Sequence, residues 1–412
     1  MHQPHAGNPW RQLPPLPRSR CRSCAAAPPG HPSHDVFRRC QVLAEVPQSP
    51  SPGRIGLPYN PALDGLRAVA IVLVLLSHAH APMFEGAFYG VDIFFVLSGY
   101  LITSLLLQEL QGAGRIDYLR FFRRRFLRLM PALLLFLAVY CLVAPLLWPG
   151  LDDMYADALV AALYLADYGI AFFDQPDKLL HMWSLSVEEH FYLLWPPLLA
   201  LLVRHVPPGK VWRPVLLLCV LAWAWRVLWV DQGQQFYEVF FRFDTRASGL
   251  LMGSLLACLL REQPAWFGAL RQRMAHGMWL VFAVPLLMAH SWDNMDAMVW
   301  GITVVEGGTL MALLAVQREH TLLHEMLRAP ALVWVGRLSY GVYLWHYPVV
   351  RYLRTDLHWS LTVALGLAIS LALAALSFYT VERWALRWRD ARPAPRTPLR
   401  QRPTGPPALS FR

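Results

Sequence analysis

Charged residues are scarce in this chain: they make up 16% of its 412 residues, whereas hydrophobic residues make up 56%. The mean hydropathy is +0.35. A soluble globular protein of this length does not need so much apolar surface, so the composition excludes that class. It predicts a polytopic membrane protein, in which apolar runs of about 20 residues recur along the chain.

A disulfide framework is also missing. Of the six cysteines, three lie within the first 40 residues and three inside apolar runs, which is not the spacing of a disulfide-linked domain. Cys21 and Cys24 form a CxxC pair with His31 and His34 downstream, but no second pair follows, so we predict no metal site. We also expect no tightly bound cofactor.

The N-terminal stretch lacks the features of a cleaved signal peptide, which would show an apolar core of about 7 to 15 residues before a small-residue cleavage site. Residues 1–58 are rich in Pro, Arg, Ser and Ala, and we predict a disordered cytoplasmic tail or an over-extended start. Residues 391–412 are predicted to form a disordered basic tail. A single membrane domain is predicted between them, over residues 59–390.

Apolar runs predict an all-α bundle of about ten transmembrane helices. The runs cover residues 63–82, 89–109, 127–148, 184–204, 213–230, 246–260, 277–291, 297–316, 335–353 and 360–382. Arginine-rich loops follow the second and fourth runs, and positive loops stay in the cytoplasm, so both termini are predicted to be cytoplasmic. The net charge of +10 is explained by these loops and tails rather than by nucleic-acid binding.

Residues 155–173 are apolar enough to span, but counting them would place the basic loop near residues 204–213 outside. We therefore predict a helix in or near the outer interface, or a re-entrant segment.

Arg67 and His78 place two polar side chains within one apolar run, LDGLRAVAIVLVLLSHAH, residues 63–80. Eleven positions along an α-helix return them to the same face, about 16 Å apart along the axis. Arg67 is near enough to the helix end to snorkel to the interface. His78 is either a packed interface histidine or a functional group, and polar groups inside membranes favour function.

The segment YLRFFRRRFLRLMP, residues 118–131, concentrates arginines at the inner mouth of the predicted bundle. Guanidinium groups bind phosphate oxygens bidentately, so Arg124, Arg125 and Arg128 are candidate ligands for a phosphate-bearing molecule. The positive-inside rule alone would supply some of these charges.

Several acids lie in or beside apolar runs. Gly90 and Gly99 in GVDIFFVLSGYLIT are expected to allow close helix packing, while Asp92 is a candidate hydrogen-bond acceptor at the outer edge. Glu188 and Glu189 need partners inside an apolar helix, whether they are structural or orient an acceptor. The predicted topology offers Arg242, Asp244 and Arg246 on the same outer side. Glu306, Tyr340, His346 and Glu382 are weaker candidates, with structural hydrogen bonds expected for Tyr340 and His346.

Seven strings in order across residues 59–390 resemble membrane-bound acyltransferase family 3, the multi-pass O-acyltransferases that modify bacterial surface and secreted glycans. They are DGLRAVA with the Arg67 to His78 spacing, GVDIFFVLSGYLIT, RRFLRLMP, WSLSVEEHFYLLWP, FDTRASGLLMG, LSYGVYLWHYPV and residues 377–383. Two departures are His190, where Gln is expected, and Trp384, where Pro often follows the last acid.

The resemblance implies transfer of a short acyl group, typically acetyl from acetyl-coenzyme A in the cytoplasm, to a hydroxyl of a carbohydrate acceptor. Arg67 and His78 match the family's first-helix pair, and Arg125 with Arg128 match its basic motif. His78 would act as a general base or as an acyl-accepting nucleophile, and both remain open. The expected location is the bacterial inner membrane, in contact with lipid and not with nucleic acid; the oligomeric state is not predicted.

A rival interpretation is a secondary transporter or flippase that uses His78, Glu188 and Glu306 as a proton relay. No inverted repeat is evident in the sequence, which disfavours it. A non-catalytic membrane scaffold is a third interpretation.

Overall fold

The computed structural model describes residues 59–82, 84–150, 153–231, 236–274, 295, 297–318 and 321–390. These residues form helices and no β-strand. The all-α prediction is therefore confirmed for the described part of the chain. The two predicted tails, residues 1–58 and 391–412, and the possible zinc ligands of the first tail lie outside it.

Nine long helices make up most of the described chain: α2 (Pro61–His78), α3 (Gly90–Ala113), α4 (Tyr118–Leu147), α7 (Met182–His205), α8 (Trp212–Asp231), α10 (Phe243–Glu262), α13 (Ile302–Val316), α15 (Pro330–Leu353) and α16 (Trp359–Ser377). Shorter elements connect or extend them: η3 (Glu85–Tyr89), α5 (Met154–Ala162), α6 (Ala166–Phe173), α9 (Phe236–Phe240), α11 (Phe267–Met274), η4 (Ala297–Gly301), α14 (Leu322–Leu327), η5 (Phe378–Glu382) and α17 (Arg383–Asp390).

The long helices correspond to nine of the ten predicted membrane spans, and the tenth, at 277–291, lies outside the described residues. Seven helical segments within the described chain are long and apolar enough to cross a membrane; α7 and α15 are not among them. Both helices carry charged residues along their length, Glu188 and Glu189 in α7, and Arg337 and Arg351 in α15. The chain is an all-α integral membrane protein, while the number of spans and the side of the termini stay predictions.

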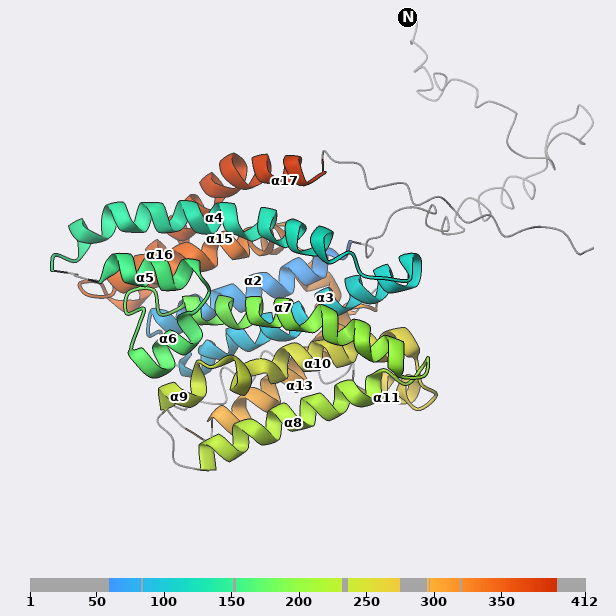
Figure 1. Ribbon diagram of the computed structural model, residues 1–412. Helices are drawn as coiled ribbons and strands as arrows, with labels where there is room; N and C mark the ends of the chain where they lie inside the picture. The colour runs from blue at the N-terminus through green and yellow to red at the C-terminus, as the bar shows by residue number, and fades with distance from the viewer. Residues whose placement is uncertain are drawn as a thin grey trace, which may run out of the picture. The chain divides into compact units, whose positions relative to one another are not determined.

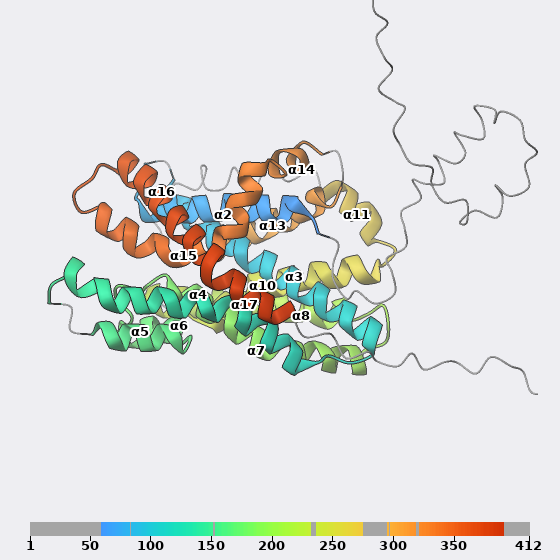
Figure 2. The ribbon, with the colours of Figure 1, turned by 90° about the horizontal axis from the view of Figure 1, so that it is seen from above.

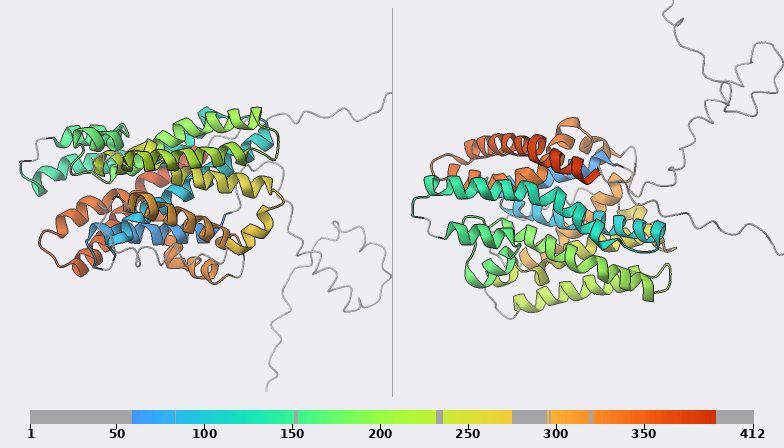
Figure 3. Two further views of the ribbon diagram at one scale, coloured as in Figure 1. Left: turned by 90° about the horizontal axis from the view of Figure 1, so that it is seen from below. Right: turned by 45° about the horizontal axis from the view of Figure 1, so that its top comes forward.

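The long helices run roughly alongside one another (Figure 1). The short helices α5, α6 and α9 gather at one end, and α11 lies at the other end with the α3–α4 and α7–α8 connections. We call these the outer and inner ends, following the predicted topology. Helix α17 lies beside α4 in two views (Figures 1 and 2). Helices α8 and α16 lie on opposite sides of the bundle (Figure 3), where much of their surface is exposed.

Local signals set the helix ends that later position the candidate site. Asn60 caps α2 by accepting a hydrogen bond from the amide of Ala62, and Pro61 occupies the first helical position. Helix α3 ends at Ala113 and is capped by Gly114, whose φ of +71° is the left-handed conformation that glycine adopts freely. Asp117 then caps α4 through the amide of Arg120. The caps at Asn60 and Asp117 therefore start α2 and α4 at the inner end.

Residues 155–173 form two short helices, α5 and α6, rather than one span. They are separated near Tyr164, whose φ is +55°. Helices of nine and eight residues are about 12 to 14 Å long, which is too short to cross a bilayer. The prediction that this segment is not a span is confirmed, and its depth in the interface stays a prediction.

Helices α3 and α10 touch through glycine. A Cβ added to Gly99 would lie 1.9 Å from the carbonyl oxygen of Leu250, and one added to Gly253 would lie 2.0 Å from that of Val96. Neither position has room for a side chain. The expected role of Gly99 in close helix packing is therefore confirmed, and Gly253 extends the same contact.

We expect Gly253→Ala to lower the stability of the bundle by about 1 to 3 kcal/mol, because α3 and α10 must separate to admit the methyl group. The matched control is Gly112→Ala, since a Cβ at Gly112 meets no atom within 4 Å. Thermal unfolding of both variants in detergent is the measurement. Equal melting temperatures for the two would contradict the close contact.

Candidate active site

A cavity of about 860 Å³ lies among α2, α3, α4, α7 and α15. One face of α3 lines it from Val91 to Glu109, which is about 27 Å of helix axis. The inner end of the cavity contains Tyr59 and Asn60, and the other end reaches Ser184 and Tyr343. The cavity is therefore long and narrow and follows α3 through much of the bundle.

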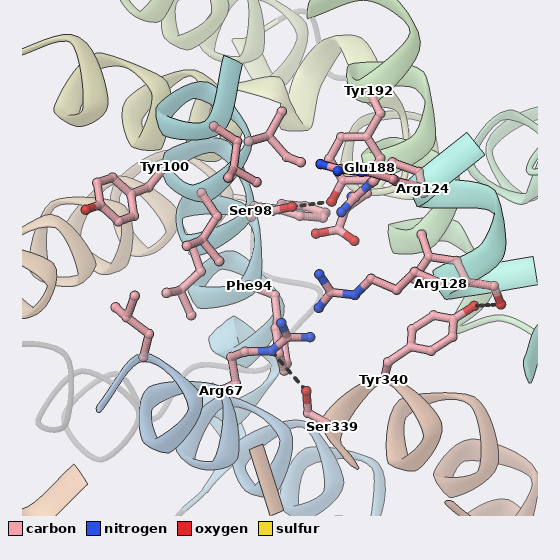
Figure 4. A pocket seen from close by; sticks show the side chains of 18 of the residues that line it. Arg67, Phe94, Ser98, Tyr100, Arg124, Arg128, Glu188, Tyr192, Ser339 and Tyr340 are labelled. Atoms are coloured by element: carbon pink, nitrogen blue, oxygen red, sulfur yellow. Dashed lines mark hydrogen bonds between the residues drawn. The ribbon is translucent and has the colours of Figure 1, made fainter. Parts of the chain in front are cut away.

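Arginine side chains dominate the charge of this cavity. The lining includes Arg67 of α2 together with Arg120, Arg124, Arg125 and Arg128 of α4. Residues 120, 124 and 128 are four apart, so they share one face of α4. Figure 4 shows Arg67 and Arg128, from different helices, pointing into the same space. The predicted phosphate-binding residues are therefore brought together with Arg67.

Arg67 is held from one side. Its Nε donates to the hydroxyl of Ser339 at 3.1 Å, from α15 (Figure 4). Tyr340, the next residue, donates its hydroxyl to the carbonyl oxygen of Leu129 at 2.9 Å. The structural hydrogen bond expected for Tyr340 is thus confirmed, and this tyrosine also lines the cavity. These two contacts fix α15 against α2 and α4 around the arginines.

Three polar side chains, those of Ser98, Arg125 and Tyr192, lie together midway along the cavity. The guanidinium carbon of Arg125 lies 3.5 Å from the ring centroid of Tyr192, a cation–π contact. The Tyr192 hydroxyl is hydrogen-bonded to Ser98 (Figure 4). Glu188 lines the same region, and the positive charges that act on it are those of Arg125 and Arg67.

This arrangement corrects the partners predicted for the paired acids. The positive charge that acts most strongly on both Glu188 and Glu189 is that of Arg125 of α4, rather than that of Arg242 or Arg246. Arg246 instead bonds Asp92, with 2.8 Å between Nη2 and Oδ1, and both side chains are 1% exposed. The physical reason is helix rotation: Glu188 faces α4 and the cavity, whereas Arg246 faces α3.

Arg242 and Asp244 form a pair of their own within one turn. The Arg242 Nε donates to the Asp244 carboxylate at 2.9 Å. Trp225 donates its indole N–H to the other carboxylate oxygen at 2.7 Å. Asp244 therefore has its partners outside the cavity.

A buried charge network surrounds the Asp92–Arg246 pair; we use this name for Asp92, Arg226, Arg246 and Glu306. The Arg226 Nη1 lies 3.7 Å from Glu306, and the two side chains are 0% and 2% exposed. Ser248 bonds both of them, at 2.7 Å to Arg226 and 2.5 Å to Glu306. The four formal charges cancel. Arg226 was not predicted as a site residue, although an arginine inside the apolar run 213–230 indicates a buried partner.

His78, predicted to lie on the same helix face as Arg67, does not line the cavity that Arg67 lines. Its partly buried ring lies beyond Tyr343, at the outer end of α2. There it meets His346, with 5.1 Å between ring centroids, and Tyr347, with 5.0 Å and the rings edge-on. The eleven-residue spacing placed Arg67 and His78 on one side of α2, where both contact α15. It could not show that the cavity ends before it reaches His78.

Three histidines from three elements form a histidine cluster: His78 of α2, His181 before α7 and His346 of α15. The His181 and His346 ring centroids are 5.6 Å apart. The ring of His181 stacks on Tyr347 at 4.9 Å. His181 was not predicted as a site residue, although it lies only two residues before the WSLSVEEHFYLLWP string.

Tyr343 separates this cluster from the cavity. Its ring lines the cavity and lies 5.2 Å from the His346 ring. Its hydroxyl donates to the carbonyl oxygen of His181 at 2.8 Å and bonds Ser184 at 2.6 Å. A single layer of side chains therefore separates the end of the cavity from the histidines.

The outer side of the cluster is clamped by charged residues. Arg351 donates to the carboxylate of Asp177 at 3.0 Å and to the Tyr347 hydroxyl at 3.3 Å. Partial burial alone would raise the pKa of Asp177, but hydrogen bonds from Lys178 and Arg351 and their positive charges hold it below its usual range. Arg354 donates to the carbonyl oxygen of His78 at 3.0 Å. The loop before α7 is thus tied to the end of α15.

Among the described residues, no group of three or more His, Cys, Asp or Glu side chains is arranged to hold a metal ion. The relay proposed for a transporter is not continuous in this part of the chain either. Glu188 lies in the cavity, Glu306 in the charge network and His78 in the histidine cluster. No hydrogen bond seen in the described chain joins these three side chains.

Known proteins are similar to this chain over most of its length. Residues 60–380 match the family model described as "Acyltransferase domain". The chain is 30% identical over 311 residues to "O-acetyltransferase OatA" of Staphylococcus aureus, covering 72% of this chain and 51% of that protein. It is 31% identical over 313 residues to "Peptidoglycan O-acetyltransferase OatA" of Listeria monocytogenes, covering 71% and 49%.

A third relative is "Putative peptidoglycan O-acetyltransferase YrhL" of Bacillus subtilis, 30% identical over 353 residues, covering 79% of this chain and 54% of that protein. The chain thus spans about half the length of these curated relatives. No solved structure matches it. Because the family match covers well over half of the chain and agrees with the ordered motifs, the chain belongs to acyltransferase family 3.

Proposed function

We propose that this protein is an O-acyltransferase that moves a short acyl group, acetyl in the first instance, from cytoplasmic acyl-coenzyme A to a hydroxyl of a glycan. The observation that carries the proposal is the cavity, with its inner arginines and its far end one layer from the histidine cluster. The relatives named as O-acetyltransferases support the same class of reaction.

Acyl-coenzyme A has the shape and charge that this cavity suits. Its phosphates would lie among Arg67, Arg124, Arg125 and Arg128, because guanidinium groups bind phosphate oxygens at two points. Its extended pantetheine arm would follow α3 toward Tyr343. To present the thioester to His78, the Tyr343 side chain must move aside, since its ring closes the far end of the cavity.

The chemistry then requires an unprotonated ring nitrogen on His78. As a base, that nitrogen takes the hydroxyl proton while the acceptor oxygen bonds the thioester carbon. The carbon–sulfur bond breaks, and the proton passes to the departing thiolate of coenzyme A. As a nucleophile, the same nitrogen first attacks the thioester carbon, the carbon–sulfur bond breaks and coenzyme A leaves as its thiolate. In a second step the acceptor oxygen takes the acyl group from the nitrogen, and its proton passes to the thiolate. Both routes use only protein side chains and the two substrates.

The direct test is ester formation by the purified protein in detergent or nanodiscs. Radiolabelled acetyl-coenzyme A and a soluble oligosaccharide are supplied, and ester-linked label on the sugar is measured. A peptidoglycan fragment, a capsular oligosaccharide and a sugar-free buffer form separate arms. Ester-linked label on the sugar in any glycan arm supports the proposal. Acetyl-coenzyme A that stays intact in every arm, with no label on any sugar, contradicts it.

Arg67→Ala is expected to raise the KM for acetyl-coenzyme A by about tenfold or more, because one charged phosphate contact is lost. The KM for the acceptor should change little, since Arg67 lies at the donor end. Arg328→Ala is the matched control: Arg328 is exposed, contacts Glu325 at 3.5 Å and lies outside the cavity. Steady-state kinetics with each substrate varied in turn separate the two effects. An equal rise in both KM values, or a lower melting temperature with unchanged KM, would count against this role.

A further inference from the structure

His346 makes a specific contact with His78 that neither the family match nor the relatives' names assign. Its Nε2 lies 3.3 Å from Nδ1 of His78, and its side chain is 0% exposed. From the sequence we predict only a structural hydrogen bond for His346. That bond exists, but it involves the other ring nitrogen.

The protonation of His346 follows from its backbone partner. Its Nδ1 lies 2.7 Å from the carbonyl oxygen of Tyr343. A carbonyl oxygen only accepts hydrogen bonds, so the neutral His346 ring carries its proton on Nδ1. Its Nε2 therefore presents a lone pair to His78.

The same reasoning applies to His78. Its Nδ1 lies 2.9 Å from the carbonyl oxygen of Val74, one turn earlier in α2, so Nδ1 carries the proton. That N–H points at two acceptors, Val74 of its own helix and His346 of α15. The remaining nitrogen, Nε2, is then the one with a free lone pair.

We propose that His346 is a positioning residue for His78: it accepts part of the Nδ1 hydrogen bond and so aims the free Nε2 of His78 at the reacting atoms. The bond to Val74 sets the tautomer but ties the ring only to α2. The contact from His346, with the edge-on ring of Tyr347, fixes the ring relative to α15. This inference rests on the proposed function.

The contact gains strength during the reaction. When Nε2 of His78 takes up a proton or an acyl group, the ring becomes positive, and hydrogen bonds from a charged donor are stronger than neutral ones. His346 therefore stabilises the charged state more than the resting state. A loss of this contact lowers kcat rather than raising either KM.

The test compares two substitutions at one position. His346→Phe keeps a ring but removes the acceptor, and kcat should fall about 100-fold with both KM values unchanged. His346→Gln restores an acceptor oxygen near the former Nε2, and kcat should return to within about tenfold of the wild type. The control is His324→Gln, a buried histidine bonded to the backbone of Val316 at 2.7 Å and remote from His78. Its kcat should match the wild type.

A spectroscopic measurement keeps the test decisive if His346→Phe does not fold. NMR spectra of the ¹⁵N-histidine-labelled wild type and His78→Ala are compared, and the signal that the variant lacks is assigned to His78. That signal should show a protonated Nδ1 and an unprotonated Nε2. The opposite tautomer overturns the proposal, as does full activity of His346→Phe or a Gln variant as slow as Phe. A wild type that forms no ester, or an active His78→Ala variant, instead overturns the proposed function.

Discussion

Replacing His78 by alanine is expected to reduce acyl transfer by at least about 10³-fold. A positioned general base contributes about 10² to 10⁴ in rate, and a lost nucleophile removes a whole route. The measurement is ester-linked product from acetyl-coenzyme A under saturating substrates. Binding of the donor should persist, because the arginines of the cavity lie nearer the inner end.

Two further variants show whether the loss is chemical. His78→Asn keeps an N–H that can donate to Val74 but has no basic nitrogen, so it should be as inactive as alanine while it melts near the wild-type temperature. His80→Ala changes an exposed histidine two residues away and should stay active. An active His78→Asn variant would show that His78 is neither the base nor the nucleophile of the reaction.

Arg246→Met is expected to cause the largest loss of stability, about 3 to 5 kcal/mol. Removing the guanidinium leaves the carboxylate of Asp92 buried without its partner, and an uncompensated buried charge is costly. The cation–π contact of Arg246 with Phe240, at 4.6 Å from the ring centroid, is lost as well. Denaturant or thermal unfolding of the detergent-purified protein measures the effect.

The double variant Asp92→Leu/Arg246→Met separates charge from packing. Removing both charges also removes the desolvation cost, so most of the lost stability should return. The remaining difference from the wild type reports the packing and the other members of the charge network. A double variant as unstable as the single one would show that the ion pair is not the source of the loss.

The sequence alone predicted the class and the helices well, because both depend on features that are local in the chain. Apolar runs gave nine described helices, and the caps at Asn60 and Asp117 are readable in the sequence. Gly99 was predicted as a close-packing position for the same reason, because a small residue at a helix contact can be seen directly in the sequence.

The partners of buried charges could not be predicted, because they depend on how each helix is rotated about its axis. Glu188 faces Arg125 of α4, and Arg246 faces Asp92 of α3, although the predicted topology paired acids with arginines by side of the membrane alone. A charged residue inside an apolar run indicates that a partner exists. It does not say which neighbouring helix supplies that partner.

The site was predicted in part. Arg67 and the arginines of α4 meet in one cavity, as their common charge and position at the inner end suggested. His78 lies a layer further on, and its contact with His346 joins residues 268 positions apart in the chain. Helical periodicity gives the direction of a side chain but not the shape of the space in front of it.

The hydrogen bonds of Tyr343 to His181 and Ser184 have a consequence for the cell that has nothing to do with rate. A water-filled path through a membrane protein would let protons cross the membrane and dissipate the proton gradient, so such a cavity must be closed at one end. In the described chain Tyr343 closes the far end of the cavity, and the buried histidine cluster and the Arg351–Asp177 pair lie beyond it. Under the proposed function, Tyr343 moves aside at each turnover, and the bound donor then fills the space that its ring leaves.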